Sequence, residues 1–158
     1  MLIVLFLPLV TMLWHLLARW GLDLRPTDKM LVGFILTALT MAVMAVAGYR
    51  AAAVGRVSIW WELAAYILIT VAEICISVVG LELSFTAAPE SMKGFVAATW
   101  LLTVFLGNLL NAQITPLYPE VLQPGAYFTL LTLMMVPVTL AFIFVARRFN
   151  RSASVDCT

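Results

Sequence analysis

The stretch Trp60–Lys93, WWELAAYILITVAEICISVVGLELSFTAAPESMK, decides how this chain folds. Residues 60–85 are almost entirely apolar, and their only charged side chains are glutamates. An α-helix needs about 20 mostly apolar residues to cross the hydrocarbon core of a bilayer. The stretch therefore predicts a transmembrane helix that carries carboxylates within it.

The whole chain shares this apolar character. Its 158 residues are 64% hydrophobic and 11% charged, and the mean hydropathy is +1.08. A soluble domain has about half apolar and about a quarter charged residues, so this composition favours lipid as the solvent. The net charge of +1 offers no basic field for nucleic acid. Cys75 and Cys157 form neither a disulfide framework nor a metal-ligand spacing.

We predict an all-α membrane protein with about five transmembrane helices. Residues 1–150 form the bundle and 151–158 a cytoplasmic tail. The first span does not resemble a cleaved signal peptide, because it lacks a basic start and Arg19 and Trp20 stand where small residues are expected. The expected spans are 1–18, 30–49, 60–85, 94–112 and 126–146.

Lysine and arginine in the short loops predict the orientation, because cytoplasmic loops carry the excess of these residues. A cytoplasmic C-terminus puts seven of the nine basic residues inside, and the two others, Arg50 and Arg56, outside. The N-terminus of a five-span protein then lies on the outer side of the cell membrane. The seven inside residues are Arg19, Arg25, Lys29, Lys93, Arg147, Arg148 and Arg151.

Polar residues of the third span recur at helical spacing. They would form one face of a regular α-helix: Glu62, Tyr66, Thr70, Glu73, Ser77, Gly80 and Ser84. Glu73 lies near the middle, where a charged group costs about 2.5–3.5 kcal/mol on insertion scales. Such a carboxyl is expected either to exchange protons in a carrier site or, as a neutral acid, to hydrogen-bond across helices. Ser77 lies one turn further on.

Other polar residues of the spans have simpler interpretations. Trp100 lies about two turns into the fourth span and either faces a site or belongs to an interfacial aromatic belt. Glu62 and Glu82, near the span ends, are expected to be solvated or interfacial. The alternative for Glu82 is an ion pair with Lys93. His15 is expected to be structural or interfacial. His15 lies far along the chain from Glu73, so we predict no enzyme, no cofactor beyond coupling protons, and no metal.

Three motifs in one continuous run resemble a known family. They are E-x-x-x-S-x-x-G-L-E at 73–82, A-P-x-x-M-K at 88–93 and W-L-L-T-x-x-x-G-N at 100–108. Their order and spacing resemble the tenth and eleventh helices of the proton-dependent oligopeptide transporters of the major facilitator superfamily. LFLPLVTMLW at 5–14 and DKMLVGFILTAL at 28–39 resemble the eighth and ninth helices more loosely.

The resemblance implies a function and a site. Glu73 stands where the family's glutamate pairs with the peptide amino terminus, and it is also the candidate for proton coupling. Ser77 neighbours the same pocket, and Trp100 stands where a tryptophan lines a side-chain pocket. The chain would be the C-terminal part of a proton-coupled symporter of di- and tripeptides.

The N-terminal six-helix bundle and the seventh helix of the family have no counterpart in the sequence. Alternating access needs two bundles around a shared site, so the chain is expected to be a truncated transporter that does not transport alone and needs its missing N-terminal half. The alternative is a small membrane scaffold or subunit that binds a partner through the polar stripe around Glu73.

Overall fold

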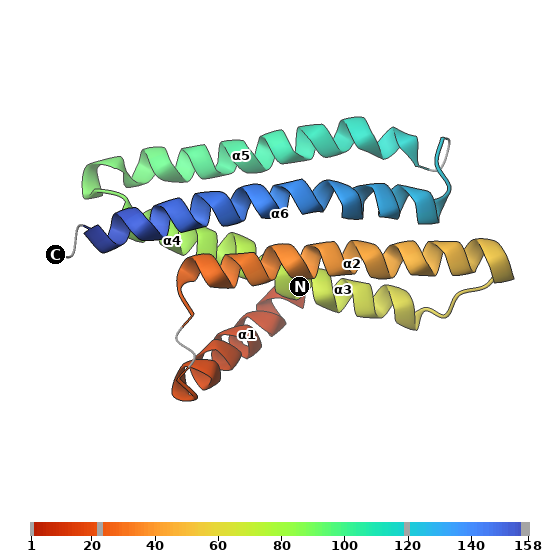
Figure 1. Ribbon diagram of the computed structural model, residues 1–158, viewed down its shortest axis with the longest axis horizontal. Coiled ribbons are helices and arrows are strands. Elements are labelled where there is room, and N and C mark those ends of the chain that lie inside the picture. Colours follow the sequence, from red (N-terminus) through yellow and green to blue (C-terminus); the bar gives the residue numbers. More distant parts are fainter. Residues whose placement is uncertain (1, 22–23, 119–120, 156–158) are drawn as a thin grey trace.

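The structure, a computed structural model, describes residues 2–21, 24–118 and 121–155. These residues form helices joined by short connections, with no strand among them, which confirms the all-α class (Figure 1). Residues 156–158 of the predicted tail, including Cys157, lie outside the described residues. The elements are α1 Leu2–Arg19, α2 Pro26–Val54, α3 Trp60–Glu73, η1 Ile74–Val78, α4 Val79–Ala87, η2 Glu90–Met92, α5 Lys93–Ile114, η3 Thr115–Leu117 and α6 Pro124–Val155.

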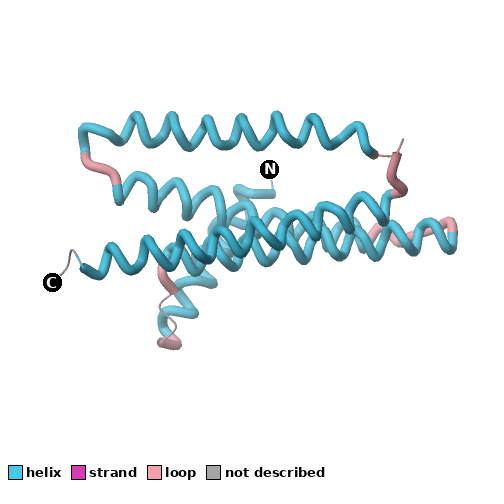
Figure 2. Tube along the Cα trace, turned by 45° about the horizontal axis from the view of Figure 1, so that its top comes forward, coloured by secondary structure: helices cyan, strands magenta, loops and turns pink. Residues whose placement is uncertain are grey.

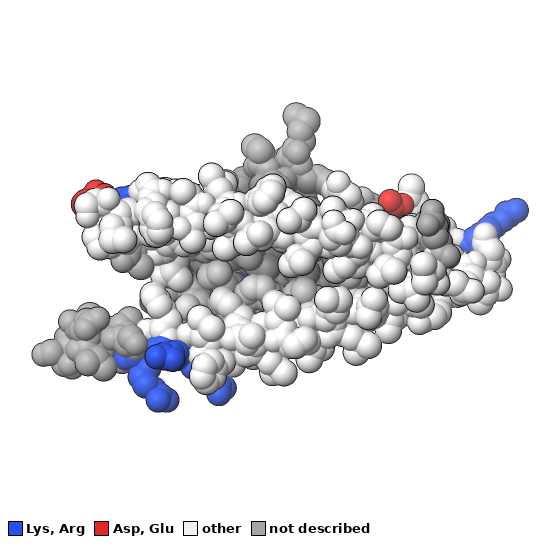
Figure 3. Space-filling model, turned by 90° about the horizontal axis from the view of Figure 1, so that it is seen from above, with Lys and Arg blue, Asp and Glu red and all other residues white. Residues whose placement is uncertain are grey.

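Four of the helical segments are long and apolar enough to cross a membrane: 26–54, 60–86, 90–117 and 124–151. A shorter apolar segment, Phe6–Leu16, lies in α1, within the first predicted span. Figure 3 shows basic and acidic side chains near the two ends of the visible face and none across its middle. This distribution fits a membrane protein, because charge avoids the hydrocarbon layer.

Helix α2 packs along α6, with a close glycine contact at one end of the interface and a side-chain hydrogen bond at the other. At one end Gly48 lies so close to Gly125 that an added Cβ would be 2.6 Å from its nitrogen. At the other end the Asn150 amide donates to the Thr27 hydroxyl at 2.9 Å. Small residues that allow close approach, and polar pairs across helices, are the usual means of association in lipid.

Helix α2 also contacts the third span at Gly33. A Cβ on Gly33 would lie 2.6 Å from Cγ1 of Ile76 and 3.0 Å from the Ala72 carbonyl oxygen. Cys75, fully buried, forms a small core with Val10 of α1. The glycine thus lets α2 approach the middle of the third span, where the candidate site residues lie.

The ends of α2 follow local rules. Pro26 occupies the first turn, where a missing N–H has no cost. The Asp28 carboxylate accepts a hydrogen bond from the Arg25 backbone N–H at 3.3 Å. At the other end Gly55 adopts a left-handed φ of 71° and donates to the Ala51 carbonyl, the usual C-terminal arrangement for glycine.

Helix α5 stands apart from the rest of the described bundle. It contacts α4 and the short turns at its own ends, η2 and η3, and residues 101–113 are all exposed. Figure 2 shows α5 running beside the other helices without joining the α2–α6 pair. Most of its apolar surface therefore faces lipid or chain outside the described residues.

Candidate functional site

The third span is not one regular α-helix. Residues Ile74–Val78 form a π-helical turn, which is wider than an α-helical turn and changes the register of the residues that follow. Gly80, which follows this turn, is buried, as is Thr70, which precedes it, whereas Glu73 and Ser77 are exposed. The predicted single polar face is therefore wrong, because it assumed an uninterrupted 3.6-residue period.

Glu73 is the last residue of α3, directly before the π-helical turn. Its neighbours Ala72, Ile74 and Cys75 are buried against α1 and α2, so the backbone is fixed while the carboxylate projects outward. Among the described residues its carboxylate has no hydrogen-bond or ion-pair partner. The group is thus free to meet a proton or a cation from outside this part of the chain.

Trp100 belongs to α5 and reaches back to the third span. Its indole lies directly on Gly80, and Met30 of α2 lies 3.0 Å from the position of a Cβ there. Glycine leaves the space that the ring fills. At about 1.5 Å of rise per residue, Gly80 lies about 4.5 Å beyond Ser77 and about 10 Å beyond Glu73 along the helix axis. Gly80, on which the Trp100 indole lies, therefore follows Glu73 by about two turns.

The ion pair of Lys93 with Glu82, one of two predicted settings for Glu82, does not form. Its ammonium lies 2.6 Å from the Glu90 carboxylate, three residues earlier and across the start of α5. The η2 turn places Glu90 beside Lys93, whereas Glu82 lies further back on α4. Glu82 instead lines a cleft among α1, α2 and α4.

The end of the bundle away from Lys93 holds an aromatic-lined cavity of about 360 Å³. Glu62 lines it together with Trp61, and the Arg50 guanidinium lies 5.4 Å from the centre of the Trp61 ring. Tryptophan beside arginine is typical of a membrane interface. This setting agrees with the peripheral role predicted for Glu62.

The predicted site residues thus fall into two groups. Glu73 and Ser77 lie together on the third span, and Trp100 approaches the same span from α5 through Gly80. Sequence reasoning missed the π-helical turn and the indole–glycine contact. Gly80 lay on the predicted stripe, but a glycine at helical spacing does not indicate which side chain covers it.

No group of three or more His, Cys, Asp or Glu side chains that could hold a metal ion occurs in residues 2–21, 24–118 and 121–155. His15, on α1, lines the same cleft as Glu82. Glu73 lines neither this cleft nor the aromatic-lined cavity, so His15 and Glu73 share no cavity of the two.

Comparison with known sequences agrees with this architecture. Residues 1–130 match the POT family, and that range includes Glu73, Ser77 and Trp100. The chain is 42% identical over 96 residues to Peptide transporter 3 of Caenorhabditis elegans. This matched stretch is 60% of this chain and 13% of that protein.

Two other relatives give the same result. Solute carrier family 15 member 2 of Rattus norvegicus is 38% identical over 103 residues, 65% of this chain and 14% of that protein. Peptide transporter family 1 of Drosophila melanogaster is 37% identical over 98 residues, 62% of this chain and 13% of that protein. The matched stretch is therefore a small part of each relative.

Proposed function

The chain belongs to the POT family, and on that premise we propose that it is the C-terminal part of a proton-coupled transporter of di- and tripeptides. The observation that carries the proposal is the match of residues 1–130 to this family. Relatives at 37–42% identity bear names that state peptide transport. Because the match covers 13–14% of the relatives, we assign transport to an assembly larger than these residues.

Glu73 is proposed to bind the substrate ammonium and the coupling proton in turn. A carboxylate within a span is costly unless it is neutralised, and either a proton or a peptide amino terminus can neutralise it. Arrival of one then favours departure of the other, which is the elementary requirement of coupling. The outward projection of Glu73, without a partner among the described residues, supports this role.

Ser77 and Trp100 are proposed to complete the pocket on this side. The Ser77 hydroxyl follows Glu73 by one wide turn and is exposed with it. Trp100 presents a large apolar ring from α5, held on Gly80. An aromatic wall beside a carboxylate suits a ligand with a charged amino terminus and a variable side chain.

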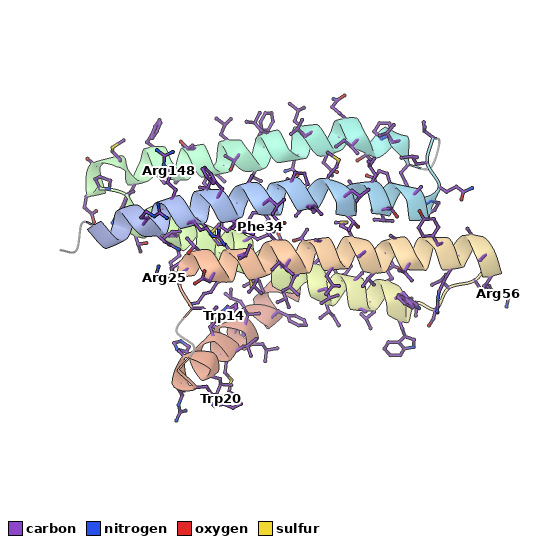
Figure 4. The ribbon with its side chains drawn as sticks, in the orientation of Figure 1. Trp14, Trp20, Arg25, Phe34, Arg56 and Arg148 are labelled. Carbon is purple, nitrogen blue, oxygen red and sulfur yellow. The ribbon has the colours of Figure 1, made fainter. Side chains whose placement is uncertain are left out.

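The exposure of α5 supports a larger assembly. An N-terminal half would supply the second bundle that alternating access requires, and it would cover apolar surface that α5 now exposes. We further propose that the C-terminus faces the cytoplasm. Arg25 and Arg148 lie at one end of the bundle and Arg56 at the other (Figure 4), which is the asymmetry that the positive-inside rule uses.

The experiment is dipeptide uptake into proteoliposomes under an imposed proton gradient. It compares the chain alone, the chain with a co-expressed N-terminal half of a relative, and the same pair with Glu73→Gln. Glu62→Gln is the matched control, because Glu62 is a carboxylate of the same span that lies at its outer end. We expect uptake only by the pair, its loss with Glu73→Gln, and its retention with Glu62→Gln.

A pair that assembles but shows no uptake would contradict the proposal. The polar residues around Glu73 would then be a contact surface for a membrane partner, and the chain a scaffold. Equal loss with Glu62→Gln and Glu73→Gln would assign the effect to general damage of the third span.

A further inference from the structure

A cleft of about 570 Å³, which we call the α1–α4 cleft, lies between α1, α2 and the third span. It lies outside the Glu73 site. Its polar lining includes Trp14, His15, Lys29 and Glu82, and its apolar lining includes Val10, Ile74 and Val78.

The polarity of the cleft changes along its length. Lys29 lies in the first turn of α2 and Glu82 in the first turn of α4, toward the end of the bundle that also carries Arg25 and Arg148 (Figure 4). Ile74 lies deeper in the third span. From Ile74 to Thr86 the lining extends roughly 18 Å, at about 1.5 Å per residue, comparable to half of the ~30 Å hydrocarbon core. The cleft thus has the shape and polarity of an amphiphile.

The polar end holds a donor without an acceptor. The Trp14 indole nitrogen is buried and has no hydrogen-bond partner, the one buried side-chain polar atom of this kind in the described part of the chain. The Lys29 ammonium lies 5.7 Å from the centre of the Trp14 ring. A cation over the face of a ring whose N–H lacks an acceptor favours an anionic ligand.

The same end holds one carboxylate, that of Glu82. Lys29 and Glu82 have opposite formal charges, so the pair complements a ligand that carries both signs. A purely anionic ligand would leave the Glu82 carboxylate facing another negative charge. A quaternary ammonium could approach Glu82 but could not donate a hydrogen bond to it.

We propose that the α1–α4 cleft binds a phospholipid whose headgroup carries a phosphate and a primary ammonium, as in phosphatidylethanolamine. Lys29 and the Trp14 N–H face the phosphate, and Glu82 accepts from the ammonium. Val10, Ile74 and Val78 line the path of an acyl chain. The proposal is independent of transport, because it uses none of the residues assigned to the peptide site.

The test is native mass spectrometry of the full chain released from detergent with equal amounts of phosphatidylethanolamine, phosphatidylcholine and phosphatidylglycerol. We expect phosphatidylethanolamine to be retained about tenfold over the other two, because a hydrogen bond to a charged group is worth about a decade in a binding constant. Equal retention of the three lipids would overturn the proposal.

Variants assign the contacts. Glu82→Gln is expected to abolish the preference over phosphatidylcholine, and Lys29→Gln to lower retention of all three lipids. Trp14→Phe keeps a ring, removes the N–H, and is expected to weaken retention. The matched control is Lys93→Gln, a lysine at the same end but paired with Glu90 outside the cleft. An equal loss with Lys93→Gln and Lys29→Gln would overturn the site.

A last arm separates the lipid from a soluble ligand. Excess glycerophosphoethanolamine carries the headgroup without acyl chains, so it is expected to leave the lipid bound. Complete displacement at matched concentration would show that the acyl chain contributes nothing and would overturn the lipid assignment. Circular dichroism of each variant checks that its helices are retained.

Discussion

Replacing Gly48 by alanine tests the close backbone contact between α2 and α6. The added Cβ would lie 2.6 and 2.8 Å from the nitrogen and Cα of Gly125, and 2.9 Å from the Pro124 carbonyl carbon. Favourable contacts between such atoms are at about 3.5–4.0 Å, so α2 and α6 must separate locally by about 1 Å. All three atoms belong to the backbone and cannot rotate away.

Overpacking of this kind costs about 1–3 kcal/mol. Alanine also recovers about 1 kcal/mol of helix propensity relative to glycine, and this gain must be removed from the comparison. Gly107→Ala on α5 is the matched control, because nothing lies within 4 Å of the Cβ there. The difference in free energy of unfolding between the two variants is therefore expected to be about 1–3 kcal/mol, with Gly48→Ala the less stable.

The assay is reversible unfolding in mixed micelles, in which dodecyl sulfate is titrated and helicity is followed by circular dichroism. Gly125→Ala gives an intermediate case, because its Cβ would meet the Tyr49 ring at 2.7 Å, and a ring can rotate. If Gly48→Ala and Gly107→Ala shift the unfolding curve by the same amount, the close packing of α2 on α6 is refuted.

Three further predictions use the same preparation. Gly80→Val should displace the Trp100 indole and lower the free energy of unfolding by about 1–3 kcal/mol. This penalty should disappear in a Trp100→Ala background, as tested by a double-mutant cycle of the parent, the two single variants and the double variant. Asn150→Leu should lower the free energy of unfolding by about 0.5–1.5 kcal/mol, because it removes the hydrogen bonds with Thr27; stability unchanged from the parent would contradict that pairing. Cys75, fully buried, should resist a membrane-permeant maleimide until the chain is unfolded, in a Cys157→Ser background because Cys157 is the chain's other thiol. Rapid labelling of that native variant would show that the α1–η1 core is open.

Much of the fold could be predicted from residues alone, because a spanning helix is determined by local apolar length. The stretch 60–85 lies within the described segment 60–86, and 30–49 lies within α2. The motifs at 73–82 and 100–108 were sufficient to indicate the family, which the comparisons confirmed. The roles of Glu73, Ser77 and Trp100 stay predictions, since they depend on a ligand and on chain outside the described residues.

The sequence by itself determined the class of protein, the helical segments and the asymmetry of charge, because each depends on the local hydropathy of the chain. Tertiary structure alone decided three features: the π-helical turn at Ile74–Val78, the indole of Trp100 on Gly80, and the presence of Lys29 and Glu82 in the lining of one cleft. Each depends on how one helix packs against another. A periodic pattern of residues describes the faces of a single helix, but it does not state which neighbour covers each face or where packing changes the helical register.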